Sequence, residues 1–241
     1  MKPLSIIVPC YNEAQSLSNL FVICKKACQD KSDVEFIFVD NGSTDNSADV
    51  FKNLLSKPEN SFVRVVFVPI NKGYGYGILQ GLYQAKGQVL AWTHADLQTN
   101  PEDVILAFKK YEEDLSNQKC VVKGNRIRRN WADALFTGGM SIFASALLSV
   151  RLSDINAQPK IFHRSLLSKL DKAPYDFSLD LYLLYIAKKN GISIKSFPVD
   201  FNKREFGEAK GGGTIKGKFK LIKRTISFIF QLRRAIQKGE R

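Results

Sequence analysis

Cysteine, histidine and long apolar runs are all scarce in this sequence. Cys10, Cys24, Cys28 and Cys120 form no Cys-x-x-Cys pair, and no signal peptide precedes Ile6, so we expect reduced cysteines in a cytosolic protein. No uninterrupted apolar run approaches the roughly 20 residues of a membrane-spanning helix. No RNA- or DNA-binding motif is visible either, so nucleic acid is not an expected partner.

Positive charge, by contrast, is abundant. The chain has 241 residues, of which 44% are hydrophobic and 24% charged, as in a globular protein, and its net charge is +13. Residues 215–241 hold nine Lys or Arg and one Glu, so this segment carries most of the surplus. A charge of this size favours acidic partners such as phosphates or an anionic membrane.

β-rich apolar runs alternate with helical patterns in the first half. The runs are LSIIVP, VEFIFVD, VRVVFVP, GQVLAW and KCVVKGN. Near-continuous apolar strands separated by helices are typical of a parallel sheet covered on both faces. We therefore predict an α/β doubly wound fold with a mostly parallel twisted sheet, which binds its ligands at the carboxyl ends of the strands.

The pattern is looser in the second half. It predicts a helix over 133–149, a short element over 159–163, a helix over 178–190 and a strand over 192–201. A polar, glycine-rich loop over 202–213 follows, and then the basic segment.

Polar residues cluster where the predicted strands end, over 11–13, 40–45, 71–77 and 94–98. Each cluster alone also fits turn and capping chemistry. Four of them on one edge of a parallel sheet indicate a binding site. The glycine run KGYGYG within the third cluster does not have the spacing of a dinucleotide fingerprint.

The fourth cluster contains three side chains that can bind a metal. His94, Asp96 and Gln98 stand at alternate positions, which on an extended segment project to one side. Asp96 is the natural ligand of a hard divalent cation, with Gln98 as a neutral oxygen donor. The alternative is that His94 ends the strand and Asp96 caps a helix that starts near Pro101.

Four motifs together resemble the nucleotide-sugar domain of family 2 glycosyltransferases, which have the GT-A fold. They are SIIVPCYNEAQSL, FVDNGSTDNS, NKGYGYGILQGL and HADLQTNPEDV. The resemblance implies that Pro9, Tyr11, Glu13 and Asp40 hold the base and ribose of the donor. It further implies that the HAD element binds Mn²⁺ or Mg²⁺ and the diphosphate, through Asp96 with His94, Ala95 and Gln98, and that Lys72 contributes to the donor site.

The second half resembles dolichol-phosphate mannose synthases and related polyprenyl-phosphate sugar synthases. The matching segments are GNR, SDINAQPKIFHRSLL and FPVDFNKREFGEAKGGG. The resemblance implies that a hexose moves from GDP-mannose or a UDP-hexose to a polyprenyl or dolichyl phosphate. It makes Asp96 and Arg126 catalytic residues and adds Arg126, Arg204 and Lys210 to the donor-binding set. It also makes Lys160, Arg204 and Lys210 cations for the acceptor phosphate. It also divides the chain into a glycosyltransferase domain over 1–213, with a nucleotide-sugar half over 1–125 and an acceptor half over 126–213, and a helix over 214–241.

Departures from the family patterns leave the metal and the acceptor open. His94 stands where the first aspartate of D-A-D usually sits, and imidazole suits manganese better than magnesium. Lys160 replaces an arginine, and no arginine occurs between Asn130 and Val150, where these synthases usually carry one near the acceptor phosphate.

The acceptor decides whether a general base is needed. A hydroxyl acceptor, as in cell-surface polysaccharide synthesis, needs a carboxylate or histidine, for which the sequence offers Asp154, Asp180 or His163. A lipid phosphate is already largely ionised at neutral pH and needs only cations around it. A non-catalytic basic binding protein is the third alternative.

The basic segment has the pattern of an amphipathic helix. Apolar residues at steps of three, four or seven, among them Phe219, Ile222, Ile226 and Ile229, alternate with lysines and arginines. Such a helix suits an anionic membrane surface, with the protein held peripherally on the cytoplasmic face, but it also suits packing on the protein's own core. A membrane-embedded partner and a homo-oligomer both stay open.

Overall fold

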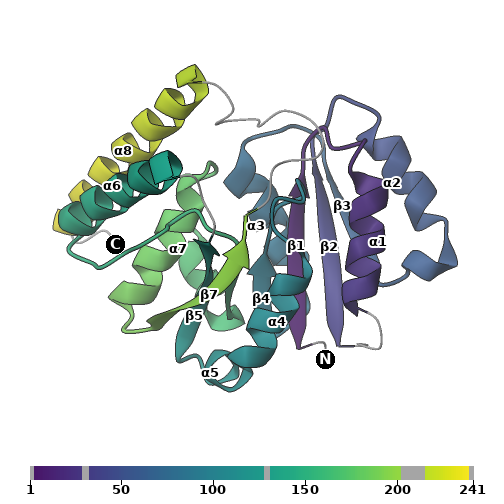
Figure 1. Ribbon diagram of the computed structural model, residues 1–241, viewed down its shortest axis with the longest axis horizontal. Coiled ribbons are helices and arrows are strands. Elements are labelled where there is room, and N and C mark those ends of the chain that lie inside the picture. Colours follow the sequence, from purple (N-terminus) through teal and green to yellow (C-terminus); the bar gives the residue numbers. More distant parts are fainter. Residues whose placement is uncertain (1–2, 29–32, 128–130, 202–214, 239–241) are drawn as a thin grey trace.

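The chain folds around one seven-stranded sheet with strand order β3-β2-β1-β4-β6-β5-β7. The computed structural model describes residues 3–28, 33–127, 131–201 and 215–238 (Figure 1). The strands are β1 (Leu4–Cys10), β2 (Val34–Asn41), β3 (Val63–Val68), β4 (Val89–Trp92), β5 (Cys120–Ile127), β6 (Lys160–His163) and β7 (Ser193–Asp200). β6 runs antiparallel to both of its neighbours and the other pairs are parallel, so the predicted mostly parallel α/β sheet is confirmed.

Helices cover both faces of the sheet, as the near-continuous apolar strands require. They are α1 (Leu17–Cys28), α2 (Ser47–Leu55), η1 (Pro58–Asn60), α3 (Tyr74–Gln84), α4 (Glu102–Lys110), α5 (Glu112–Ser116), α6 (Trp131–Leu148), η2 (Arg164–Leu170), α7 (Ser178–Lys189) and α8 (Ile215–Gln237). One core joins the sheet to α1, α2 and α4, and the other joins it to α3, α6, α7 and α8. The elements predicted over 133–149, 159–163, 178–190 and 192–201 correspond to α6, β6, α7 and β7, with ends shifted by a few residues at most.

The strand order places the candidate site. β1 pairs in parallel with β2 on one side and with β4 on the other, so the chain winds outward in both directions from β1. In open parallel sheets of this kind, the crevice outside the carboxyl ends of the strands at such a switch point is the usual ligand site. The loop after β1 and the HAD segment after β4 therefore border the same crevice.

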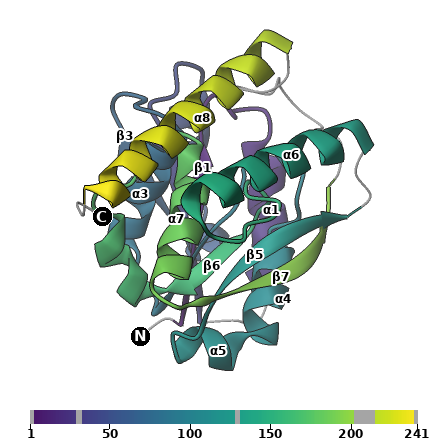
Figure 2. The ribbon, with the colours of Figure 1, turned by 90° about the vertical axis from the view of Figure 1, so that its left-hand side faces the viewer.

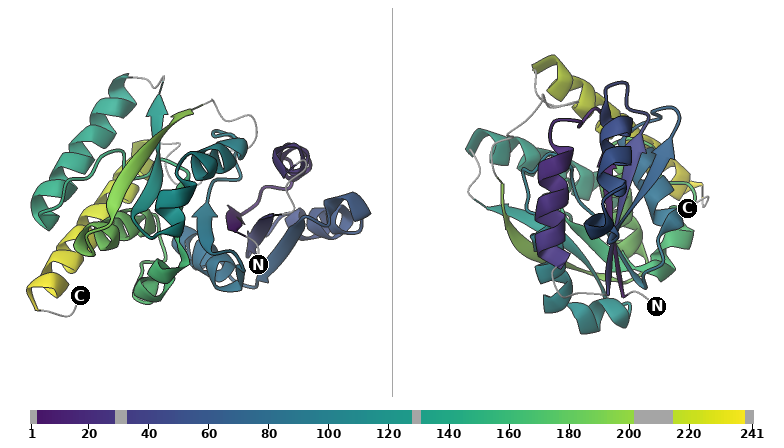
Figure 3. Two further views of the ribbon diagram at one scale, coloured as in Figure 1. Left: turned by 90° about the horizontal axis from the view of Figure 1, so that it is seen from below. Right: turned by 90° about the vertical axis from the view of Figure 1, so that its right-hand side faces the viewer.

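α8 packs partly on the protein itself. Ile229 and Leu232 are fully buried in the core that includes α6 and α7, whereas Phe219 and Phe230 are exposed. Figure 2 shows α6 and α8 running side by side, and Figure 3 shows both at the end of the molecule opposite α1 and α2. The core-packing alternative for this helix thus holds for Ile229 and Leu232. Within the ranges that the structure describes, no helix is long and apolar enough to cross a membrane.

Candidate active site

Hydrogen bonds tie the loop after β1 to the loop after β2. Asn12 Oδ1 accepts from the Thr44 backbone N–H at 2.8 Å, and the Asn12 N–H donates to Ser43 Oγ at 3.0 Å. The Glu13 N–H donates to Ser47 Oγ at 3.1 Å. These polar residues therefore do more than cap local turns, because they fix the two strand-end loops relative to one another.

Asp40 lies at the base of these loops. It is buried, and its Oδ1 accepts from the Ser43 N–H at 3.1 Å. Burial raises the pKa of the Cys10 thiol, and the nearby carboxylates of Glu13 and Asp40 raise it further, so both acids face the end of β1. Pro9 and Tyr11, next to Cys10, are half-buried at the same place. The predicted base and ribose residues are thus gathered at one edge of the sheet.

The HAD segment has a different backbone from the one the sequence suggested. β4 ends at Trp92, Asp96 Oδ1 accepts from the Gln98 N–H at 3.2 Å, and Leu97 has a φ of 56°. A bulky residue in the left-handed region marks a tight turn. Residues 94–98 are therefore a turn, and the expectation of one extended segment with three side chains on the same side is wrong.

The turn still presents Asp96 at the carboxyl end of β4. The alternative that Asp96 caps the next helix is also wrong, because Asn100 Oδ1 accepts from the Glu102 N–H at 3.0 Å at the start of α4. Asp96 and Gln98 are half-buried, and Ala95 is buried. Across the described ranges, no group of three or more His, Cys, Asp or Glu side chains could hold a metal. An oxygen set of Asp96 with diphosphate oxygens and water fits a hard divalent ion that is bound together with its nucleotide.

Three aromatic rings from three elements meet beside this turn. The Tyr74 ring at the start of α3 stacks on Phe177, with centroids 4.5 Å apart and an interplanar angle of 12°. The His94 ring also lies against the Tyr74 ring, with ring centroids 5.6 Å apart and an interplanar angle of 34°. Burial raises the pKa of the Tyr74 hydroxyl, and Asp180 and Asp96 raise it further, so the hydroxyl stays protonated.

A buried polar network lies below the stack. Lys160 Nζ is 3.1 Å from Asp180 Oδ1, and this oxygen also accepts from Trp92 Nε1 at 3.1 Å and from Gln158 Nε2 at 2.9 Å. Gln158 Nε2 lies 3.1 Å from the Tyr74 hydroxyl as well. Burial lowers the pKa of the Lys160 ammonium, and Asp180 opposes this effect.

Lys160 was expected to contact the acceptor phosphate. Its side chain is fully buried and its charge is paired with Asp180, so its position does not fit direct contact with a phosphate arriving from solvent. It fits a positioning role instead, because it ties β6 to the start of α7 under the strand-end loops.

Arg126 is also paired. Its Nε donates to Asp154 Oδ1 at 3.1 Å, its Nη2 donates to the same oxygen, and its guanidinium lies 5.3 Å from the centre of the Phe201 ring. Gly124, two residues before Arg126, leaves no room for a side chain, because an added Cβ would lie 1.9 Å from the Gln158 carbonyl oxygen. The glycine of the GNR element thus allows β5 to approach the segment before β6.

The glycine run KGYGYG serves close packing of α3 on the segment before α7. A Cβ on Gly73 would lie 2.3 Å from the Tyr175 carbonyl oxygen, and one on Gly75 would lie 2.5 Å from that of Pro174. Gly73 also has a φ of +123°, which disfavours any other residue. The run therefore shapes the wall of the site.

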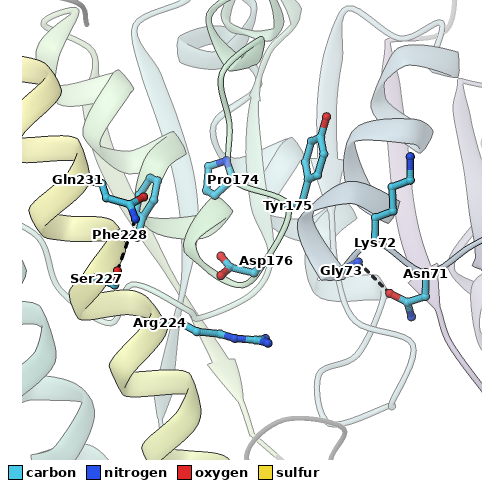
Figure 4. A pocket seen from close by; sticks show the side chains of 10 residues that line it. All are labelled: Asn71, Lys72, Gly73, Pro174, Tyr175, Asp176, Arg224, Ser227, Phe228 and Gln231. Atoms are coloured by element: carbon cyan, nitrogen blue, oxygen red, sulfur yellow. Dashed lines mark hydrogen bonds between the residues drawn. The ribbon is translucent and has the colours of Figure 1, made fainter.

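An open pocket of about 700 Å³ adjoins this wall (Figure 4). Its lining residues come from three places: Asn71, Lys72 and Gly73 before α3; Pro174, Tyr175 and Asp176 before α7; and Arg224, Ser227, Phe228 and Gln231 on α8. The predicted donor residue Lys72 lies on this pocket, with its ammonium 5.1 Å above the Tyr76 ring.

Some site residues were predicted and others were missed. Arg204 and Lys210 lie outside the residues that the structure describes. The residues that sequence reasoning missed are Tyr74, Gln158, Trp92, Phe177 and the pocket residues of α8. Tyr74 and Gln158 stand inside the family motifs, but no signal in the sequence indicated their contacts, because their partners lie far away in the chain.

The solved structures that resemble this chain define the class of fold. Glucosyl-3-phosphoglycerate synthase from Mycobacterium tuberculosis, in a complex with Mn²⁺, UDP and glucosyl-3-phosphoglycerate, matches with a TM-score of 0.71 and 17% identity over 96% of this chain and 80% of that one. A mannosyltransferase from Pyrobaculum calidifontis, in complex with GDP-mannose and Mn²⁺, matches with a TM-score of 0.63 and 17% identity over 85% of this chain and 58% of that one. The fold is that of GT-A glycosyltransferases.

Residues 5–170 match the glycosyl transferase family 2, and the chain belongs to that family. Among curated relatives, an undecaprenyl-phosphate 4-deoxy-4-formamido-L-arabinose transferase from Photorhabdus laumondii is 27% identical over 219 residues, which cover 87% of this chain and 63% of the relative. A protein of the same name from Proteus mirabilis is 32% identical over 61% of this chain and 43% of its own length. The chain thus spans about half the length of these relatives.

Proposed function

We propose that this chain transfers a hexose-type sugar from a nucleotide sugar to the phosphate of a polyprenyl carrier, with inversion at the anomeric carbon. Family membership supports the glycosyl transfer, and the names of the curated relatives support undecaprenyl phosphate as the kind of acceptor. The base and the sugar of the donor stay open between GDP-mannose and UDP-hexoses.

The proposal depends on one observation about the general bases that the sequence suggested. Each of them is either held in an ion pair or lies away from the strand-end loops. Asp154 is paired with Arg126, and Asp180 with Lys160. His163 pairs with Val89 at the start of β4, at the sheet edge opposite the strand-end loops. A phosphate acceptor needs none of them, because its second pKa is about 6 and its oxygen is already ionised at neutral pH.

The proposed step moves no proton. An acceptor phosphate oxygen bonds to the anomeric carbon while the bond from that carbon to the diphosphate breaks, and the nucleoside diphosphate leaves. Asp40, with Pro9, Tyr11 and Glu13, would hold the nucleoside. Asp96 would hold Mn²⁺ or Mg²⁺, which neutralises charge on the diphosphate. Arg126, Arg204 and Lys210 remain proposed phosphate contacts, and Lys72 remains a proposed donor contact.

A second candidate is transfer to a hydroxyl acceptor. It is favoured by Asp176, a half-buried carboxylate that lines the open pocket. In this alternative Asp176 would take the acceptor's proton. Asp176→Asn would then abolish transfer, whereas it would leave transfer to a phosphate acceptor intact.

Acceptor trials test the proposal directly. The purified chain would be incubated with labelled GDP-mannose or UDP-glucose, Mn²⁺, and either undecaprenyl phosphate, farnesyl phosphate or free sugars. We expect labelled product with the polyprenyl phosphates alone. Donor-dependent labelling of free sugars, with none of the lipid phosphates, would refute the proposed acceptor and favour the second candidate.

We further propose that an anionic membrane surface is a partner. Exposed apolar side chains of α6 and α8 lie close together, with the Phe143 and Phe230 rings 6.2 Å apart and Ile142 beside Phe143 exposed. Exposed Lys220 and Lys223 lie on the same helix as Phe230. Such a surface suits peripheral attachment next to a lipid acceptor.

A further inference from the structure

The pocket between α8 and the start of α3 has polar walls on both sides. Arg224, Ser227 and Gln231 line the α8 wall, and Asn71 and Gly73 line the opposite wall. Figure 4 shows the Arg224 side chain extended from α8 toward the Asn71 side of the pocket. The pocket's volume of about 700 Å³ is within the usual range for small-molecule sites.

Arg224 differs from Arg126, Lys160 and Lys123, the other basic residues near the strand ends apart from Lys72 at the pocket itself. Arg126 and Lys160 are paired with Asp154 and Asp180, and Lys123 is buried and donates to the Gly124 carbonyl at 3.0 Å. Arg224 is exposed, and no ion pair to it is found among the residues that the structure describes. A guanidinium that reaches into an open pocket is suited to bidentate contact with a phosphate.

We propose that this pocket binds the phosphate of the acceptor and that Arg224 contacts it directly. The inference rests on the proposed function, because it takes the acceptor to be a polyprenyl phosphate. It assigns a binding site to α8, which has so far been considered only as a core or membrane helix.

The opposite wall supplies a second donor. Asn71 Oδ1 accepts from the Gly73 N–H at 2.8 Å, which fixes the orientation of this amide. The Asn71 Nδ2 group is the donor end of the same side chain. Lys72 adds positive charge at the rim, where its ammonium lies over Tyr76. Arg224 and Asn71 thus bring donors from two elements that are distant in sequence.

The pocket borders the HAD segment through Tyr74. Gly73 lines the pocket, and the next residue, Tyr74, carries the ring that lies against His94. A phosphate in the pocket would therefore lie across the start of α3 from the proposed diphosphate site. Two phosphorylated substrates need cations between and around them to offset their repulsion, and Arg224 fits that need.

The carboxylate of Asp176 should repel a phosphate in this pocket. Asp176 and Arg224 should therefore have opposite effects on phosphate affinity. Its Oδ1 accepts from the Ser178 N–H at 2.9 Å at the start of α7, and the residue lines the same pocket as Arg224. Asp176→Asn keeps an oxygen for the Ser178 N–H and removes the negative charge. Phosphate binding should therefore become tighter in Asp176→Asn and weaker in Arg224→Gln.

The experiment compares these two variants with Arg234→Gln, a matched loss of charge on the exposed side of α8. Farnesyl phosphate binding is measured by calorimetry, and its KM is measured in the transfer reaction. We expect Arg224→Gln to raise both Kd and KM by roughly tenfold to a hundredfold, the usual effect of losing a charged hydrogen bond. Arg234→Gln should change neither constant, and nucleotide binding should stay the same in all three variants.

The outcomes separate the site from the function. If the unmodified protein transfers sugar to farnesyl phosphate but Arg224→Gln behaves like Arg234→Gln, the function stands and the site is refuted. If farnesyl phosphate binds in an Arg224-dependent way without any transfer, the site stands and the proposed function fails. Binding to vesicles of phosphatidylglycerol in phosphatidylcholine provides the third arm. If Arg224→Gln weakens vesicle binding alone, Arg224 meets a lipid headgroup and the acceptor assignment is refuted.

Discussion

Lys160 Nζ and Asp180 Oδ1 lie 3.1 Å apart in the interior, and at most 1% of either side chain is exposed. The pair joins β6 to the first turn of α7. Because Trp92 at the end of β4 donates to the same carboxylate oxygen, the pair also fixes the strand that leads into the HAD turn. A charge pair at this depth is a positioning device, since neither group reaches solvent.

Removing one partner of this pair should destabilise the fold strongly. Lys160→Met or Asp180→Asn leaves a buried charge without its partner, and each should lower the free energy of unfolding by about 3–5 kcal/mol. The double variant should lose less than the sum of the two, because no unpaired charge remains. Urea unfolding of the four proteins measures this coupling, and strictly additive losses would show that the two charges do not interact.

Asp96 should be essential for metal-dependent transfer. Asp96→Asn removes the carboxylate at the HAD turn but keeps an oxygen for the Gln98 N–H, so the fold should persist. We expect turnover to fall by at least about a hundredfold, as for loss of a transition-state contact of about 3 kcal/mol. Turnover is measured with Mn²⁺ and with excess chelator.

Asp49→Asn is the matched control for Asp96→Asn. Asp49 is exposed and pairs with Lys52 on α2, away from the HAD turn, so this variant should keep full activity. Near-normal turnover of Asp96→Asn in the presence of chelator would exclude Asp96 as the metal ligand.

The sheet was predictable because its signals are local. Runs such as VEFIFVD are typical of strands buried on both faces of a covered parallel sheet, and β2 is buried along its whole length. The location of Asp40 at the binding edge was predictable for the same reason, since the carboxyl ends of parallel strands share one edge of the sheet. β6 was recognised only as a short element, because four residues carry no signal of their direction.

The side-chain partners were not predictable, because they depend on contacts between distant residues. The sequence predicts that Lys160 contacts the acceptor phosphate, whereas the approach of α7 buries its side chain against Asp180. The turn at 94–98 was misjudged as extended because alternation over five residues does not exclude a tight turn. In the structure, Leu97 adopts a left-handed conformation there.

The buried Lys123 should make the stability of the protein change with pH in the alkaline range. Burial lowers the pKa of its ammonium to about 8, and the nearby charges of Lys160 and Arg126 contribute. An unfolded lysine has a pKa of about 10.4, so the unfolded state binds more protons between these two values, and stability rises with pH across that window. Below pH 8 the buried charge costs stability.

Replacing this lysine by methionine tests the sign. Lys123→Met keeps the length of the side chain without its charge, and it should raise the free energy of unfolding at pH 7 by about 1–3 kcal/mol. The advantage over the parent should shrink as the pH rises from 8 to 10. Chemical unfolding across this range measures it, and an advantage that grows with pH would contradict the assignment.

The exposed side of α8 should hold the protein on anionic membranes. Lys220 and Lys223 are exposed, and Phe219, the residue before Lys220 on α8, is 68% exposed. Each basic residue near an anionic surface contributes roughly 1 kcal/mol of attraction, so Lys220→Gln with Lys223→Gln should weaken vesicle binding by about thirtyfold. Flotation with phosphatidylglycerol vesicles measures the loss.

Arg234→Gln with Lys238→Gln is the control, because it removes the same charge from the other end of α8, near the residues that pack on the core. It should have a smaller effect on vesicle binding. Nucleotide binding should be unchanged in both double variants, and transfer should fall for a vesicle-embedded acceptor but persist for farnesyl phosphate. Normal vesicle binding by the Lys220/Lys223 variant would refute the membrane role of this surface.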